Sequence, residues 1–379
     1  MTILSILQCT NFGGLEQATY RTMRFLRDVC GASFKVATPG PFGAGAELLR
    51  GFDGQATDFR YRGRFGWRDF PEFSRHVRCV AAACDSVWIS GASATALAAA
   101  RLVGTAAHRP PIVLSHHHHH FEGGHFEDGM SWLRWRAFYE TLCRGVSRVV
   151  YATAFTRDEA LRIAPWLDGK ATVIHPSVQA HHLDEATRRR LQHEARLRLG
   201  LPTGAWIVGN SGWIIQRKRF DVFLRTAREI RRRIPDSHFV ICGAGDLEDD
   251  MRRLASDLGL DGSVRFAGWV DDLTPYYQAW DVALFNSDHD ALGLTPLEAA
   301  AWGGLVVASV VHGGLGEFVE HGRTGFLFRR HDPERLADAV VQLARGSVDV
   351  DGIRRAATAK LIAEFSPEET GAAYARLLG

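Results

Sequence analysis

The sequence predicts an α/β protein built from two successive open parallel sheets. With 379 residues, the chain is longer than one hydrophobic core usually organises, so two domains are expected. In both halves, apolar runs of strand length alternate with stretches whose apolar residues recur at helical spacing. Near the start, a glycine turn at Gly13 and Gly14 separates such a run from a helical stretch. Strand, glycine turn and helix in this order form the unit of an open parallel sheet.

The composition excludes several classes of protein. With 46% hydrophobic and 23% charged residues, the chain is predicted to be folded over most of its length. A net charge of +2 argues against binding to nucleic acid through bulk charge. The longest apolar runs, such as 305–311, are far shorter than the roughly 20 residues that span a bilayer. Residues 1–8 lack the basic region and cleavage site of a signal peptide, so we interpret them as a buried strand and expect a cytoplasmic protein.

The first domain is expected to comprise residues 1–178. Its first strand covers residues 2–8. A helix is expected to follow and to end near Gly31, because Leu15, Ala18, Leu26 and Val29 recur at helical spacing. Further strands are predicted at 34–37, 86–89, 112–114, 148–151 and 172–174.

The second domain is expected to comprise residues 179–360, after a junction in the polar, charge-rich passage 183–204. Its strands are predicted at 206–210, 239–242, 264–267, 282–285 and 305–309, and its helices at 220–233, 246–258 and 294–302. The end of the chain, 361–379, is expected to carry a helix that crosses back to the first domain. Ser366 is its predicted cap and Pro367 lies in its first turn.

The segment 286–300 carries groups suited to a phosphorylated, hydroxyl-rich ligand. It follows a strand and enters a helix near Thr295, so free N–H groups close to Gly293 would point at an anion. Asp290 and Glu298 bracket this turn, and a carboxylate suits a diol. Taken alone, the segment fits an ordinary strand-to-helix connection equally well.

Three consecutive cations, Arg217, Lys218 and Arg219, follow the first strand of the second half. A solvated basic loop would explain them on its own. Together with the acidic segment 286–300 of the same domain, they favour a site for a phosphate group.

Six stretches of the second half follow one another in a fixed order over about 100 residues, and such a series is far more specific than a single glycine motif. They are Lys218–Asp221, Phe239–Leu247, Val264–Leu273, Asp281–Ser287, Leu292–Ala299 and Gly313–Val319. In these stretches the chain resembles retaining glycosyltransferase family 4. The resemblance implies a GT-B fold, in which two Rossmann-like domains face each other across a cleft, with the donor bound by the second domain.

The resemblance implies a role for each candidate residue. Asp290, where the family usually has Glu, would hold hydroxyls of the donor sugar, and Glu298 the ribose of the nucleotide. Lys218 would face the diphosphate. Trp213 stands where the family usually has an arginine, so Arg217 or Arg219 would substitute for it. The other donor contacts in this half would come from Gly245, Trp269, Leu292, Gly293, Leu294 and Thr295.

The first half resembles the family more loosely. Gly13 and Gly14 would let the backbone approach the donor phosphates or the acceptor, or would form only a tight turn. In the histidine run 116–120, the family's active-site histidine fits best at His117, with His116 and His118 as neighbouring candidates. Successive histidines alternate faces on a strand, which disfavours a metal site. The aromatic, arginine-rich stretch 132–144 fits a core helix, or a helix that faces a membrane.

The function implied by the resemblance is retaining transfer of a sugar from a nucleoside-diphosphate sugar, linked to UDP or GDP, to an acceptor hydroxyl. Asp290, His117 and Lys218 would be its catalytic residues, and no metal or other cofactor is implied. The acceptor would be a glycan, a lipid or a small molecule, with possible peripheral contact at the inner face of the membrane. Two alternatives remain: a nucleotide-sugar epimerase of the same fold, and a non-catalytic protein that binds nucleotide sugars or glycans.

Overall fold

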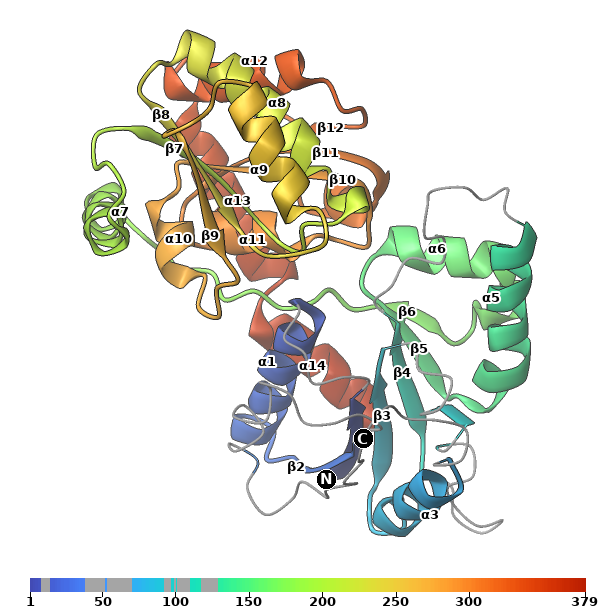
Figure 1. Ribbon diagram of the computed structural model, residues 1–379. Helices are drawn as coiled ribbons and strands as arrows, with labels where there is room; N and C mark the ends of the chain where they lie inside the picture. The colour runs from blue at the N-terminus through green and yellow to red at the C-terminus, as the bar shows by residue number, and fades with distance from the viewer. Residues whose placement is uncertain are drawn as a thin grey trace. The chain divides into compact units, whose positions relative to one another are not determined.

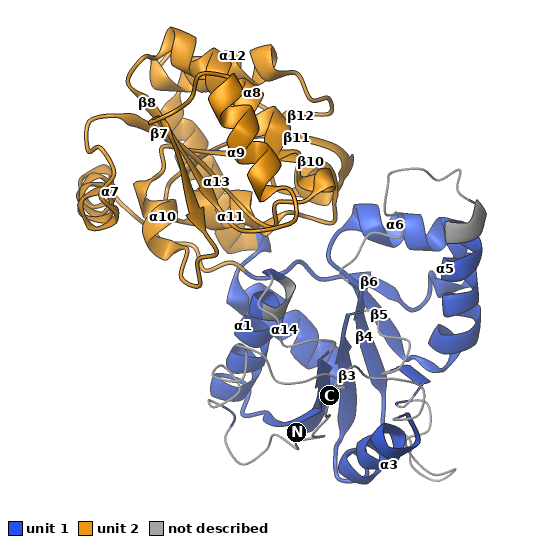
Figure 2. Cartoon of the chain, in the orientation of Figure 1, with its two compact units in different colours: residues 1–177, 364–379 blue, residues 178–363 orange. Residues whose placement is uncertain are grey.

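The computed structural model describes residues 1–7, 14–37, 52, 70–91, 97–98, 100, 110–116 and 129–379. The chain divides into two units: unit 1 comprises Met1–Ser177 with Glu364–Gly379, and unit 2 comprises Val178–Ala363 (Figure 2). Each unit carries one parallel sheet with helices packed against it (Figure 1). The predicted α/β class with two parallel sheets is therefore confirmed.

In the described part of unit 1, six strands pair in the order β2-β1-β3-β4-β5-β6, and every pairing is parallel. All residues of β3 and β4 are buried, as expected for a parallel sheet covered on both faces. The strands are β1 (Thr2–Leu7), β2 (Ser33–Ala37), β3 (Ser86–Ser90), β4 (Ile112–His116), β5 (Arg148–Tyr151) and β6 (Ala171–Val173). The helices are α1 (Gly14–Asp28), α3 (Phe70–Ala81), α5 (Gly129–Leu142), α6 (Ala154–Ile163) and α14 (Pro367–Leu378).

Two helix layers cover the sheet of unit 1. On one face, α1 and α14 pack together through residues such as Met23 and Tyr374, and on the other lie α3, α5 and α6. The cap predicted for the last helix is confirmed, because the Ser366 hydroxyl accepts a hydrogen bond from the Glu369 N–H at 3.2 Å. Val29, one of the apolar positions at helical spacing, does not belong to the helix. Helix α1 ends at Asp28, and the Val29 side chain is 67% exposed.

In unit 2, six strands pair in the order β12-β11-β10-β7-β8-β9, again all in parallel. They are β7 (Trp206–Ser211), β8 (Ser237–Cys242), β9 (Val264–Gly268), β10 (Val282–Asp290), β11 (Leu305–Gly313) and β12 (Phe326–Phe328). The helices are α7 (Glu185–Leu199), α8 (Phe220–Arg233), α9 (Glu248–Asp257), α10 (Thr274–Ala279), α11 (Leu294–Ala301), α12 (Pro333–Ala344) and α13 (Val350–Glu364), whose last residue belongs to unit 1.

The strand order of unit 2 contains a switch point between β7 and β10. From β7 the chain runs outward through β8 and β9, and then returns to β10 on the other side and continues to β11 and β12. In open α/β sheets, ligands bind outside the carboxyl ends of the strands at such a point. The loop after β7 and the end of β10 are therefore where the fold places a binding site.

Several elements of unit 2 differ from the expectation, since α10, β12 and α12 were not predicted and β11 continues to Gly313. Strand β10 continues to Asp290 and pairs with β11 as far as Gly313, whereas the sequence predicted a loop after residue 285. The charge-rich passage expected to hold the domain junction contains helix α7. Its residue Arg196 forms a buried ion pair with Asp281 at 2.7 Å. The same guanidinium donates hydrogen bonds to the backbone carbonyls of Ala279, Thr203 and Ala205.

Candidate active site

Two cations and a carboxylate meet at the switch point. Lys218 ends a short 3-10 helix, Gln216–Lys218, that follows β7, and Asp290 is the last residue of β10. The Lys218 ammonium forms an ion pair with the Asp290 carboxylate, and the Arg217 guanidinium lies 3.5 Å from the same oxygen. The side chains of Lys218 and Asp290 are each 14% exposed. Because two cations face this carboxylate, the group keeps an excess of positive charge that suits an incoming anion.

The chain around Lys218 is bound to β10 by further contacts. The Ser287 hydroxyl donates to the Arg217 carbonyl at 3.1 Å, and Arg217 donates to the His289 carbonyl at 3.3 Å. The Lys218 ammonium also lies 4.8 Å from the centre of the Phe285 ring. Burial lowers the pKa of Lys218, and the negative charge of Asp290 opposes this shift. The contacts of Lys218 thus depend on the polar end of β10.

Helix α11 begins directly beside this ion pair. Gly293, the residue before it, has φ 79°, and a Cβ added there would lie 2.9 Å from the Phe285 ring. Both facts explain a glycine at this position. Gly293 provides no side-chain cap for the helix, and the N–H groups of an uncapped helix N-terminus suit an anion.

Glu298, one turn into α11, accepts a hydrogen bond from the Tyr277 hydroxyl at 2.8 Å. The same tyrosine lies 3.2 Å from the Ser211 hydroxyl at the end of β7, and Ser211 in turn lies 2.8 Å from the Thr295 hydroxyl. Burial, together with the charge of Glu298, raises the pKa of Tyr277 well above its usual value. Tyr277 and Ser211, which position Glu298 and Thr295, could not be predicted from the sequence because neither belongs to a recognisable motif.

A pair of exposed tryptophans stands at the carboxyl ends of β7 and β9. Trp213 and Trp269 are 46% and 44% exposed, and their ring centres lie 4.7 Å apart. Gly245 lies between their backbone segments, and a Cβ added to it would lie 2.4 Å from the Ile214 carbonyl. The Ile214 N–H donates to the Ala244 carbonyl at 2.9 Å. These contacts hold the backbone next to Trp213 against the segment that follows β8.

The remaining predicted site residues are placed unevenly. Leu292 is buried, Leu294 is half-buried at the start of α11, and Gly14 is exposed at the start of α1. Gly13 and His117 lie outside the described residues. The neighbouring candidate His116 is fully buried, where it stacks on Trp135 with ring centres 5.1 Å apart. Its side chain is part of the core of unit 1.

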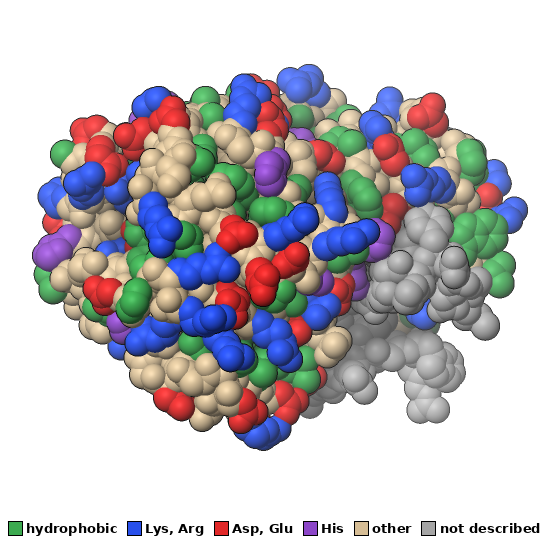
Figure 3. Space-filling model, turned by 90° about the horizontal axis from the view of Figure 1, so that it is seen from above, with side chains coloured by type: hydrophobic (Ala, Val, Ile, Leu, Met, Phe, Trp, Pro, Cys, Tyr) green, Lys and Arg blue, Asp and Glu red, His purple; other side chains and the backbone are tan. Residues whose placement is uncertain are grey.

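The aromatic stretch of the first half forms helix α5, which packs on this core. Tyr139 is fully buried and Trp132, Trp135 and Phe138 pack partly buried against the same cluster, whereas Arg134 and Arg136 are exposed. The packing of α5 therefore agrees with the first of the two interpretations, a core helix whose arginines remain exposed. None of the helices in the described ranges combines the length and apolar character that a bilayer crossing requires. In Figure 3, Lys and Arg side chains are interspersed with Asp and Glu side chains over the visible face.

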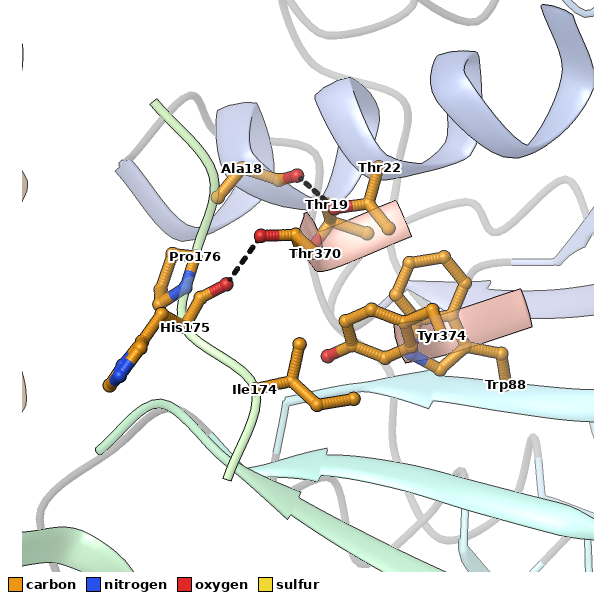
Figure 4. A pocket seen from close by; sticks show the side chains of 9 residues that line it. All are labelled: Ala18, Thr19, Thr22, Trp88, Ile174, His175, Pro176, Thr370 and Tyr374. Carbon is orange, nitrogen blue, oxygen red and sulfur yellow. Dashed lines mark hydrogen bonds between the residues drawn. The ribbon is translucent and has the colours of Figure 1, made fainter. Parts of the chain in front are cut away.

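Unit 1 contains a cavity between α1, α14 and the segment after β6 (Figure 4). The hydroxyl of Thr370 donates to the His175 carbonyl at 2.9 Å, and that of Thr22 to the Ala18 carbonyl at 3.0 Å. The nine lining residues include no Asp, Glu, Lys or Arg: they are Ala18, Thr19, Thr22, Trp88, Ile174, His175, Pro176, Thr370 and Tyr374. A cavity of this kind is not suited to a diphosphate.

The two parallel sheets with their helix layers define the class: this is the GT-B fold. A solved structure of HepE from Anabaena in complex with UDP-glucose matches the fold with a TM-score of 0.81 and 20% sequence identity, and the match covers 100% of this chain and 99% of that one. Two family models match the sequence, "Glycosyl transferases group 1" at residues 205–345 and "Glycosyltransferase Family 4" at residues 12–182. The two halves of the chain therefore carry glycosyltransferase domains of these two descriptions.

Curated relatives agree with this assignment. The lipopolysaccharide core biosynthesis glycosyltransferase LpsE of Rhizobium meliloti is 33% identical over 183 residues, which is 48% of this chain and 52% of that protein. The D-inositol 3-phosphate glycosyltransferase of Corynebacterium aurimucosum is 36% identical over 162 residues, covering 41% of this chain and 38% of that protein. The chain thus matches these relatives over about half of their length or less.

Proposed function

We propose that the protein is a retaining glycosyltransferase that moves a sugar from a UDP- or GDP-linked donor to an acceptor hydroxyl. The observation that carries the proposal is the meeting of Arg217, Lys218 and Asp290 beside the N-terminus of α11, at the switch point of the sheet of unit 2. The matches to the two family models and the nucleotide-bound complexes of HepE support it.

Each part of the donor has a candidate partner in unit 2. Lys218, Arg217 and the first N–H groups of α11 would take up the negative charge that develops on the departing diphosphate. Asp290 would accept hydrogen bonds from hydroxyls of the transferred sugar. Glu298, held by Tyr277, would accept those of the ribose diol. The exposed ring of Trp269 offers the nucleobase a surface for stacking.

The proposed chemistry needs stabilisation of the leaving diphosphate and of a positively charged sugar. A leaving phosphate oxygen on the same face would accept the proton of the acceptor hydroxyl, so that the anomeric configuration is retained without a protein nucleophile. Lys218, Arg217 and the helix N-terminus carry the charge that a divalent ion would otherwise supply, and we propose that transfer is independent of metal. His117 is proposed to contact the donor sugar near the reacting carbon.

The test combines binding with product analysis. The protein is screened for thermal stabilisation by UDP, GDP and their common sugars, since a ligand bound to the folded state raises the melting temperature. The stabilising donor is then incubated with candidate acceptors in EDTA, and the product's anomeric configuration is determined by NMR. We expect a glycoside that retains the donor's configuration. A donor that is epimerised without consumption of acceptor would establish the epimerase alternative, and stabilisation by none of the nucleotides would overturn the donor site.

A further inference from the structure

Arg219 has an unusual backbone conformation. Its φ is 48° and its ψ is 46°, and it is the one residue other than glycine with positive φ in the described part of the chain. This left-handed conformation is unfavourable for a residue with a side chain. Such a conformation persists only where its surroundings over-determine it, and it is often found near functional sites.

The Arg219 side chain supplies part of what holds this conformation. Its guanidinium donates two hydrogen bonds to the Asp221 carboxylate, at 2.9 and 3.0 Å, and one to Asp288 at 3.0 Å. Burial raises the pKa of Asp221, but the hydrogen bonds and charge of Arg219 outweigh it, so that the pKa is lowered. Arg219 therefore joins the first turn of α8 to the polar end of β10.

Asp288 is itself held from the other side. It lies 3.0 Å from His331 Nε2, the other ring nitrogen of His331 lies 2.7 Å from the Ser309 hydroxyl, and Asn286 donates to that hydroxyl at 2.8 Å. One placement of the protons satisfies all of these hydrogen bonds: Nε2–H of His331 donates to Asp288, and Nδ1 accepts from the Ser309 hydroxyl. Ser309, His331 and Asp288 are the residue types of a hydrolase triad, but the serine faces Nδ1 and the aspartate faces Nε2, the reverse of that arrangement, and Ser309 has no exposed surface. We interpret this series of hydrogen bonds as one that fixes the position of the Asp288 carboxylate.

The geometry gives Arg219 a consequence for the site. Arg219 follows Lys218 directly, and Asp288 precedes Asp290 by two residues, on the same face of β10. The pairs Lys218–Asp290 and Arg219–Asp288 therefore join the same two segments side by side. We propose that Arg219 is a positioning residue that fixes the Lys218 ammonium against Asp290 through Asp288, and so sets the affinity for the donor's diphosphate. This inference rests on the proposed function.

The first test separates the side chain from the backbone. Arg219→Gly removes the guanidinium and relieves the unfavourable φ, whereas Arg219→Ala removes the guanidinium and keeps the unfavourable φ. We expect both variants to bind the nucleoside diphosphate, UDP or GDP, about tenfold more weakly in calorimetry, a change equivalent to roughly 1.4 kcal/mol. The melting temperature of Arg219→Gly should exceed that of Arg219→Ala. A purely structural role would instead make affinity follow the melting temperature.

A second variant and a control complete the experiment. Asp288→Asn should weaken binding of the same nucleotide as much as Arg219→Gly, and the double variant should be no weaker than either single one. Arg233→Ala, at the opposite end of α8, removes an arginine paired with Asp338 and should leave binding unchanged. If the wild type binds UDP or GDP and both Arg219→Gly and Asp288→Asn bind it equally well, the inference is overturned while the proposed function stands. If the wild type binds neither nucleotide, the proposed function fails, and the inference with it.

Discussion

Replacing Lys218 by methionine removes the ammonium and keeps most of the side-chain volume. Lys218 is 14% exposed and pairs with an equally buried Asp290, so its contact with a diphosphate would be a charge-assisted hydrogen bond in a partly desolvated place. Such a bond contributes about 1.5–3 kcal/mol, which corresponds to a roughly 10- to 150-fold rise in the Kd for the nucleoside diphosphate. Titration calorimetry with UDP and GDP measures this change.

A second buried lysine serves as a matched control, and a double variant tests whether the unpaired Asp290 contributes to the loss of affinity. Lys360 is 15% exposed and pairs with Glu320 in the same unit, away from the switch point, so Lys360→Met should leave the Kd unchanged. In Lys218→Met, Asp290 loses one of its two cations and would repel the ligand, so adding Asp290→Asn should restore part of the affinity. If Lys218→Met binds nucleotide as tightly as the wild type, the assignment of the diphosphate to this place is refuted.

Three further predictions concern the stability of the folded chain. Arg196→Ala leaves the buried Asp281 carboxylate without its charged partner, so chemical denaturation should show a loss of about 3–5 kcal/mol, and a loss under 1 kcal/mol would contradict a buried pair. Gly293→Ala forces a side chain into φ 79° and against Phe285, so the free energy of unfolding should fall by about 1–3 kcal/mol, together with nucleotide affinity; an unchanged melting temperature would disprove the close approach. Burial, with the charge of Arg219, lowers the pKa of His331 against the opposing Asp288 hydrogen bond, so below about pH 6.5 the unfolded chain binds the proton more readily and stability falls. His331→Gln should flatten this fall in melting curves between pH 7.5 and 5.5, and an unaltered slope would show that His331 does not cause it.

The sequence predicted the strands of unit 1 to within two residues at each end, whereas in unit 2 it missed β12 and the ends of β10 and β11. In unit 2, apolar strands alternate with amphipathic helices, and the helix predicted at 220–233 has those bounds in the structure. The end of β10 was missed because Asn286, Ser287 and Asp288 are typical of loops. They are accommodated in a strand because Ser309, Arg217 and Arg219 supply their hydrogen bonds. Such partners come from distant parts of the chain and are not visible in a local pattern.

The charged residues of the candidate site could be predicted from the sequence, whereas the residues that hold them in place could not. The cations at 217–219, the polar segment 286–300 and the resemblance to the family made Lys218, Asp290 and Glu298 candidates, and the structure pairs the first two directly. Tyr277, which holds Glu298, comes from another helix and has no motif of its own. The left-handed backbone of Arg219 is equally invisible in the sequence, since an arginine gives no signal for positive φ.

The proposed function depends most on binding of the donor diphosphate between Lys218 and the N-terminus of α11. The most direct measurement is a crystal structure of the protein with the nucleoside diphosphate that stabilises it. We expect diphosphate oxygens within hydrogen-bonding distance of the Lys218 ammonium and of the first N–H groups of α11, with the ribose hydroxyls bound to Glu298. A nucleotide bound elsewhere, with the Lys218–Asp290 pair untouched, would contradict it.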